Sequence, residues 1–168
     1  MSRIFLSVLF IVVSVYSSTA QVSVVNAEIS FLFVSKDVKG TIGGFKSTST
    51  IDFDSPESSS FAGSVSVETL DTNNGLRNWS LKNGKYFDED DFPRISFKST
   101  SVNYKEGTFM VDGNLTLKGT TKPIKINFKK NGNQLKGETS IYSYDYGIKI
   151  KKKREDNLVK ITLLFDLE

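Results

Sequence analysis

The sequence predicts an all-β domain, an eight-stranded antiparallel barrel with one short helix between strands. Two observations support this prediction: apolar and polar residues alternate along most of the chain, and turn-forming residues separate the alternating runs. A third observation, one segment in which the alternation stops, indicates the helix. A β-sandwich is the alternative arrangement of the same strands. The 168 residues are enough for one domain of ordinary size.

The alternation is clearest in residues 158–167, where large apolar residues fall on one face of the predicted strand and polar residues on the other. A further strand between residues 42 and 53 contains Gly43 and Gly44, which indicate a bulge or bend. Residues 105–107 and 131–133 are typical of hairpin turns. The shorter alternating runs lie at residues 29–33, 64–68, 95–98, 114–118, 124–129 and 135–141.

One segment, residues 72–82, reads TNNGLRNWSLK and breaks the alternation. Leu76 and Trp79 recur at a spacing of three, and Thr72 or Asn73 is the expected N-terminal cap. This pattern predicts a short helix. The helix either closes one end of the barrel as a lid or packs on the barrel wall.

The first twenty residues have the pattern of a secretory signal peptide. Arg3 precedes an apolar run over residues 4–16, and small residues follow at 17–20. The apolar run has about thirteen residues, whereas a membrane-spanning helix needs roughly 20, so cleavage after Ala20 is favoured over a retained anchor. We therefore expect a signal peptide at residues 1–20 and one exported barrel domain at residues 21–168. Export without cysteine suits a bacterial periplasm.

Composition excludes several classes of function. The sequence has no histidine and no cysteine, which removes a Ser-His-Asp triad, thiol nucleophiles and the commonest metal ligands. An enzyme would need carboxylate, lysine or tyrosine chemistry, and no paired constellation of such residues stands out. We therefore expect no catalytic residues, no cofactor and no metal site. The formal net charge of +3 is too small to indicate nucleic-acid binding.

The apolar faces of the strands are expected to point into the barrel. The opposite arrangement, an outer-membrane barrel, needs strands of roughly ten residues, and several runs here are shorter. A barrel of eight strands either fills with side chains or holds one small ligand, and the sequence leaves both interiors open. The candidate ligand contacts are Phe31, Phe33, Phe45, Phe61, Phe97, Phe109, Leu115, Phe128 and Phe165 on strands, Leu76 and Trp79 on the helix, and Phe87 in the loop after it.

Two further stretches form a recognisable pattern. Residues 86–100 read YFDEDDFPRISFKST, and residues 113–123 read GNLTLKGTTKP. They contain an aromatic pair followed by Asp, an aromatic-Pro, an I-x-F-x-S-T strand and then G-x-L-x-x-x-G-x-T-K-P. This pattern resembles the YceI-like family of exported polyisoprenoid-binding proteins. The resemblance implies a lipocalin-like barrel that holds an elongated isoprenoid lipid.

Cations near the predicted helix are candidates for binding the head group of such a lipid, because arginine matches the geometry of phosphate oxygens. The densest basic run, Lys149 and residues 151–154, either touches an anionic membrane surface or is a solubilising hairpin tip. The head-group candidates are Arg77, Lys82, Lys85 and Arg94.

The sequence thus predicts a non-enzymatic periplasmic carrier for a polyisoprenoid or similar long apolar lipid. The alternative is a structural or stress-associated exported protein with a filled barrel and no ligand. The expected partners are the isoprenoid-type lipid and, transiently, a membrane surface, with no nucleic acid among them. Exposed sheet edges also allow a homodimer.

Overall fold

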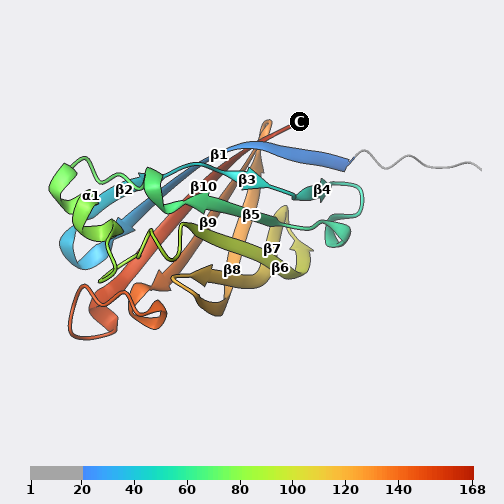
Figure 1. Ribbon diagram of the computed structural model, residues 1–168. Helices are drawn as coiled ribbons and strands as arrows, with labels where there is room; N and C mark the ends of the chain where they lie inside the picture. Colours follow the sequence, from blue (N-terminus) through green and yellow to red (C-terminus); the bar gives the residue numbers. More distant parts are fainter. Residues whose placement is uncertain (1–20) are drawn as a thin grey trace, which may run out of the picture.

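Antiparallel strands form one curled sheet in the computed structural model, which describes residues 21–168 (Figure 1). The predicted signal peptide lies outside the described residues. The strand order is β2-β1-β10-β9-β8-β7-β6-β5-β3, with β4 paired to β1. The strands are β1 (Gln21–Phe33), β2 (Val38–Ile42), β3 (Lys46–Ser47), β4 (Thr50–Asp52), β5 (Ala62–Ser66), β6 (Arg94–Lys105), β7 (Thr108–Leu117), β8 (Thr120–Asn131), β9 (Gln134–Tyr142) and β10 (Leu158–Leu167).

The helical elements are short, and most of them lie at one end of the curled sheet. The α-helix is α1 (Gly75–Lys82), and the 3₁₀ helices are η1 (Val34–Lys36), η2 (Pro56–Ser58), η3 (Val67–Thr69), η4 (Ser143–Tyr146) and η5 (Glu155–Asn157). We call the end that carries η1, α1 and residues 143–157 the helical end; it is on the left in Figure 1. The hairpin turns at Gly107 and Gly132 mark the opposite end, the hairpin end. Within residues 21–168, no helix is both long and apolar enough to span a bilayer.

The sheet curls into a barrel because one short stretch of chain joins its two sides. β3 pairs with β5, while β4, three residues further on, pairs with the first residues of β1. The lipocalin-like barrel that the sequence predicts is therefore confirmed. The strand count differs from eight because the single strand expected between residues 42 and 53 is divided among β2, β3 and β4.

The division occurs at the predicted glycine bend. Gly44 has φ +62°, and a Cβ on this residue would lie 2.7 Å from Cβ of Ser66, so the chain turns where only glycine fits. Main-chain hydrogen bonds keep the turn on the barrel, since Ser66 N donates to Gly43 O at 2.9 Å.

The register confirms the apolar face of the last strand. Val159, Ile161, Leu163 and Phe165 pair across β10 and β1 with Phe33, Phe31, Ile29 and Ala27 in turn. These pairs form successive levels from the helical end toward the hairpin end. The alternation therefore identifies the inward face, as strand geometry requires.

The N-terminus of α1 differs from the prediction. Asn74 is the cap, because its Oδ1 accepts a hydrogen bond from Arg77 N at 2.9 Å. Thr72 instead donates from Oγ1 to Asn78 Oδ1 at 2.7 Å, and Asn73 adopts a left-handed conformation with φ +56°. The two expected caps are thus used to turn the chain into the helix.

The barrel wall separates between β8 and β9 toward the helical end. The pairs between these strands extend from Asn131↔Gln134 only to Asn127↔Glu138. β8 continues along β7 to Thr120, and β9 continues along β10 to Tyr142, so the two strands diverge. The buried side chains of Tyr146 and Ile148 pack against Leu115, Leu117 and Ile141 in one apolar cluster at this end.

Candidate functional site

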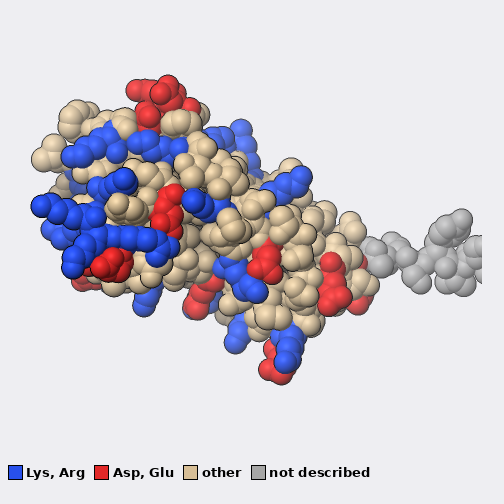
Figure 2. All heavy atoms as spheres, turned by 90° about the horizontal axis from the view of Figure 1, so that it is seen from below, with Lys and Arg blue, Asp and Glu red and all other residues tan. Residues whose placement is uncertain are grey.

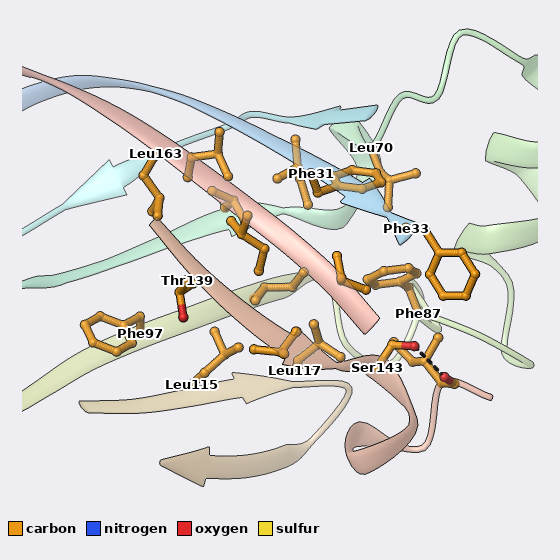
Figure 3. Close-up of a pocket in the computed structure, with 18 of the residues that line it drawn as sticks. Phe31, Phe33, Leu70, Phe87, Phe97, Leu115, Leu117, Thr139, Ser143 and Leu163 are labelled. Carbon is orange, nitrogen blue, oxygen red and sulfur yellow. Dashed lines mark hydrogen bonds between the residues drawn. The ribbon is translucent and has the colours of Figure 1, made fainter. Parts of the chain in front are cut away.

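A cavity of about 730 Å³ occupies the part of the barrel nearer the helical end. Its wall consists mainly of inward-facing side chains from β1, β2 and β5 to β10, and α1 forms part of its rim (Figure 3). Most of the lining is aliphatic or aromatic, as in Phe31, Phe97, Leu115, Leu117 and Leu163. Such a lining favours an apolar guest over water.

Side-chain exposure shows that this region is hollow. Ile29, Ile161 and Leu163 face inward, yet each is partly accessible because each borders the cavity. Toward the hairpin end, Leu135 and Val111 are 0% exposed. The sequence does not decide between a filled interior and a ligand cavity. The barrel has both, because its interior is filled near the hairpin end and hollow near the helical end.

Aromatic rings separate the two regions and form the floor of the cavity. Phe61 and Phe128 are stacked with ring centroids 4.8 Å apart, and Phe128 and Phe165 follow at 5.2 Å. All three rings border the cavity. Beneath them, Phe109 packs edge-on against Phe61 at 6.0 Å and does not line the cavity. We call Phe61, Phe128 and Phe165 the aromatic floor.

Polar groups in the wall are largely engaged with the protein itself, so the interior is more apolar than its residue types suggest. Four hydroxyl groups of the lining make hydrogen bonds: Thr139 Oγ1 donates to Lys125 O (2.7 Å), Ser143 Oγ to Ile148 O (2.9 Å) and Ser49 Oγ to Ala62 O (3.2 Å), and Ser64 Oγ accepts from Arg94 Nε (2.8 Å).

Charge in the lining is confined to its rim at the helical end. Among the described residues, Lys36 from η1 and Arg77 from α1 are the charged side chains that border the cavity. No ion pair or side-chain hydrogen bond within residues 21–168 engages either cationic group. These two groups can therefore meet an anionic head group while its chain extends toward the aromatic floor.

Buried Tyr146 contributes no acid–base chemistry to this cavity. Burial, with a smaller contribution from the negative charge of Asp145, raises the pKa of Tyr146 to about 12. The side chain is 2% exposed, lies outside the cavity lining, and its hydroxyl has no partner among the described residues. Within residues 21–168, no group of three or more carboxylates is arranged to hold a metal ion.

Ten of the twelve predicted ligand contacts border the cavity. The two that do not are Phe109, which lies beneath the aromatic floor, and Trp79, which is 69% exposed. Trp79 points away because residues 76, 77, 80 and 81 form the face of α1 that borders the cavity. The ten residues are Phe31, Phe33, Phe45, Phe61, Leu76, Phe87, Phe97, Leu115, Phe128 and Phe165.

Of the predicted head-group cations, the structure places only Arg77 at the rim. Arg94 bonds to Ser64 and to Gly44 O, where its Nη2 donates at 2.9 Å, and so fastens β6 to the glycine bend. Lys82 Nζ donates to Glu68 O. Lys85 lies over the Tyr86 ring, with Nζ 5.4 Å from the centroid.

Sequence reasoning missed Lys36, and it missed much of the aliphatic wall. Lys36 is far from α1 in sequence, and only the pairing of β1 with β2 brings η1 to the rim. The aliphatic contacts include Ile29, Ile141, Val159, Ile161 and Leu163, all of which lie on inward faces. The alternation identifies those faces, but the predicted ligand contacts are mostly aromatic side chains.

The fold and the cavity define the class: a lipocalin-like antiparallel barrel that is hollow toward one end. The chain belongs to the family of the YceI-like domain, whose model matches residues 16–168. The resemblance in residues 86–123 is thereby confirmed.

Curated proteins of similar sequence agree with the assignment of this chain to the YceI-like family. A UPF0312 protein of Photorhabdus laumondii is 33% identical over 88 residues, or 52% of this chain and 46% of that protein. Protein YceI of Salmonella arizonae is 32% identical over 93 residues, or 55% of this chain and 49% of that protein. The chain spans about half the length of the curated relatives it matches.

Solved structures show the same fold at lower identity. BcnA of Burkholderia cenocepacia has a TM-score of 0.71 at 17% identity, covering 84% of this chain and 94% of that one. A polyisoprenoid binding domain from Saccharophagus degradans, implicated in plant cell wall breakdown, has a TM-score of 0.56 at 12% identity, covering 89% and 94%.

Proposed function

We propose that this protein is a non-enzymatic carrier that binds a polyisoprenoid or similar long apolar lipid in the barrel cavity. The observation that carries the proposal is the cavity itself, which has an apolar wall, an aromatic floor and two cations at its rim. The polyisoprenoid binding domain among the structural neighbours supports the choice of lipid.

Burial of the chain supplies the affinity. Transferring only about ten methylene-sized groups, fewer than the cavity can hold, from water into the cavity is worth roughly 8 kcal/mol before ordering costs. That free energy corresponds to a dissociation constant on the order of micromolar. No catalytic group is needed, and the YceI-like family is a family of binding proteins.

Lys36 and Arg77 orient the lipid in this proposal. Both side chains border the same cavity, and in this proposal a phosphate or pyrophosphate at the rim meets both. Head-group recognition thus involves Lys36 in place of Lys82, Lys85 and Arg94, whose cationic groups contact other parts of the protein.

The place of action is the periplasm in our proposal, reached through the signal peptide at residues 1–20. Contact with a membrane would occur at the helical end, where Leu76 and Trp79 are 78% and 69% exposed. Figure 2 shows lysine and arginine side chains gathered at this end of the molecule. The acidic residues 88–91 follow α1 and offset part of this positive charge, so apolar insertion would contribute more than charge attraction.

The homodimer that exposed sheet edges would allow stays a prediction.

The alternative, a structural or stress-associated protein without a ligand, requires that the cavity serve no purpose. Native mass spectrometry separates the two functions. Gently purified protein should carry a co-purified lipid, and delipidated protein should take up prenyl alcohols. Ile161→Trp places a bulkier side chain in the cavity and should weaken uptake, whereas Lys160→Trp, on the outward face of the same strand, should not. If the wild type takes up no isoprenoid lipid, the carrier function is wrong.

A further inference from the structure

The aromatic floor suggests a limit on which chains the cavity accepts. We propose that Phe128, with Phe61 and Phe165, sets the greatest length of apolar chain that the cavity can bury, and that Gly137 positions the Phe128 ring. This inference rests on the proposed function and deepens it, because it specifies the ligand by chain length.

The floor is firmly supported from beneath. Phe61 and Phe128 are each 1% exposed, and Phe109, also 1% exposed, packs under Phe61. Leu135 on β9, which is the strand partner of Phe165 on β10, is 0% exposed. A chain that reaches the rings therefore finds no further space, since filled protein interiors are close-packed and resist insertion.

Gly137 explains why the Phe128 ring lies where it does. Phe128 and Gly137 are direct partners in the pairing of β8 with β9. A Cβ on Gly137 would lie 2.4 Å from Cε1 and 2.6 Å from Cδ1 of Phe128. The ring thus lies against bare backbone, and any side chain at position 137 would displace it toward the barrel axis and into the path of a bound chain.

The cavity volume gives the expected limit. If a carbon-sized group occupies about the volume of one water in the liquid, about 30 Å³, then 730 Å³ holds roughly 24 such groups, or about five isoprene units. Shorter chains gain affinity with each added unit. Longer chains leave the extra units in water at the mouth, and their affinity no longer rises.

The experiment measures dissociation constants of delipidated protein for prenyl alcohols, from farnesol through geranylgeraniol and geranylfarnesol to longer homologues. For the wild type, each added unit should tighten binding at least about tenfold until a plateau is reached. Phe128→Ala removes six ring carbons from the floor and should move the plateau to a chain about one unit longer. Gly137→Ala should move it in the opposite direction.

Two further variants keep the test decisive. If Phe128→Ala does not fold, Phe61→Leu takes its place, because it opens the floor with less loss of packing. Phe61→Leu should also lengthen the longest chain that the cavity accepts. Phe109→Leu disturbs the core beneath the floor and should leave the plateau unchanged, which controls for general destabilisation. Circular dichroism and thermal unfolding verify that each variant is folded.

The outcomes distinguish the two proposals. If no prenyl alcohol binds the wild type, the proposed function is wrong and the length limit fails with it. If prenyl alcohols bind but affinity shows no plateau, or if the plateau stays fixed in folded Phe61, Phe128 and Gly137 variants, only the length limit is overturned.

Discussion

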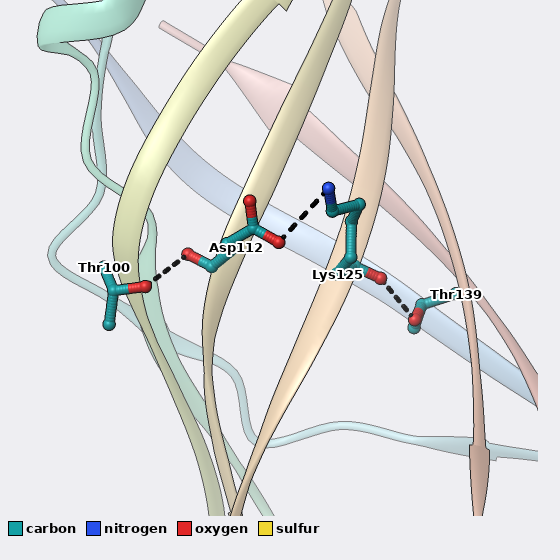
Figure 4. Close-up of polar contacts among 4 residues, drawn as sticks. All are labelled: Thr100, Asp112, Lys125 and Thr139. Carbon is teal, nitrogen blue, oxygen red and sulfur yellow. Dashed lines mark hydrogen bonds and ion pairs between the residues drawn. The ribbon is translucent and has the colours of Figure 1, made fainter.

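Thr139 donates a hydrogen bond from Oγ1 to the main-chain oxygen of Lys125, at 2.7 Å, where β8 and β9 part (Figure 4). The side chain faces the cavity, yet its hydroxyl satisfies a carbonyl beyond the last pair of the β8–β9 ladder. On the outer surface, Lys125 Nζ lies 3.4 Å from Asp112 Oδ1, so contacts on both faces join neighbouring strands at this level. We infer that Thr139 fixes where the wall opens.

Replacing Thr139 with valine should therefore destabilise the barrel although the two side chains have the same shape. The substitution leaves the Lys125 carbonyl without its hydroxyl donor, at a cost of about 1–2 kcal/mol. Urea unfolding measures the change. Thr162→Val, on β10 and without such a bond, should stay within about 0.5 kcal/mol of the wild type. Equal effects of the two substitutions would contradict the role given to Thr139.

Head-group recognition should depend on Lys36 and Arg77. Lys36→Gln and Arg77→Gln should each weaken binding of a prenyl phosphate by about threefold to tenfold, because each removes one partly solvated charge. Binding of the corresponding prenyl alcohol should change little. Calorimetry with both ligands measures the difference, and Lys39→Gln, outside the cavity lining, is the matched control. If binding of the prenyl phosphate and of the prenyl alcohol weakens equally, the two cations do not recognise the head group.

Contact with membranes should be visible through Trp79, which is the single tryptophan of the sequence. Anionic phospholipid vesicles should shift its fluorescence to shorter wavelength, since its exposed indole would enter the interfacial region. Leu76→Ser should reduce vesicle co-sedimentation, and Tyr104→Ser, an exposed aromatic on β6 toward the hairpin end, should not. An unshifted spectrum at saturating vesicle concentration would exclude this mode of contact.

Acid should loosen the loop of residues 143–157. Arg154 donates from Nε to Asp145 Oδ1 at 2.6 Å, and this contact lowers the pKa of the Asp145 carboxyl. Because the folded pKa is depressed, the stabilisation is complete above the unfolded pKa of about 3.9 and is lost as the pH falls through the folded pKa. The pair is partly exposed, so solvent screening keeps its contribution to stability small.

Hydrogen exchange of residues 143–157 tests that pH dependence. Exchange should accelerate as the pH is lowered below about 4, after correction for intrinsic rates. Arg154→Gln should show the faster exchange already at neutral pH and little further change in acid. A wild-type loop whose protection is the same at both pH values would show that the pair does not stabilise it.

The sequence was sufficient for the fold and for the inward faces because both follow from local periodicity. The run in residues 158–167 identified the side of β10 that faces the cavity. Gly43 and Gly44 likewise indicated the bend after β2. Periodicity gives a side chain's face but not its depth along the barrel axis. Phe109 and Phe128 were therefore both predicted to contact ligand, although only Phe128 borders the cavity.

The remainder of the site depends on relationships between distant segments. Lys36 reaches the rim through strand pairing, and Arg94 is engaged by Ser64 and Gly44 from other parts of the chain. The separation of β8 from β9 was also not predictable, because apolar and polar residues continue to alternate at residues 124–126, beyond the last pair of the ladder with β9.

The carrier function requires that a lipid chain enter the hollow part of the barrel. Crystallisation of the delipidated protein with geranylgeraniol tests it most directly. We expect continuous density that runs from the rim near Arg77, past Leu163 and Thr139, and ends on the ring of Phe128. An empty cavity at saturating ligand, or density only on the outer surface, would contradict it.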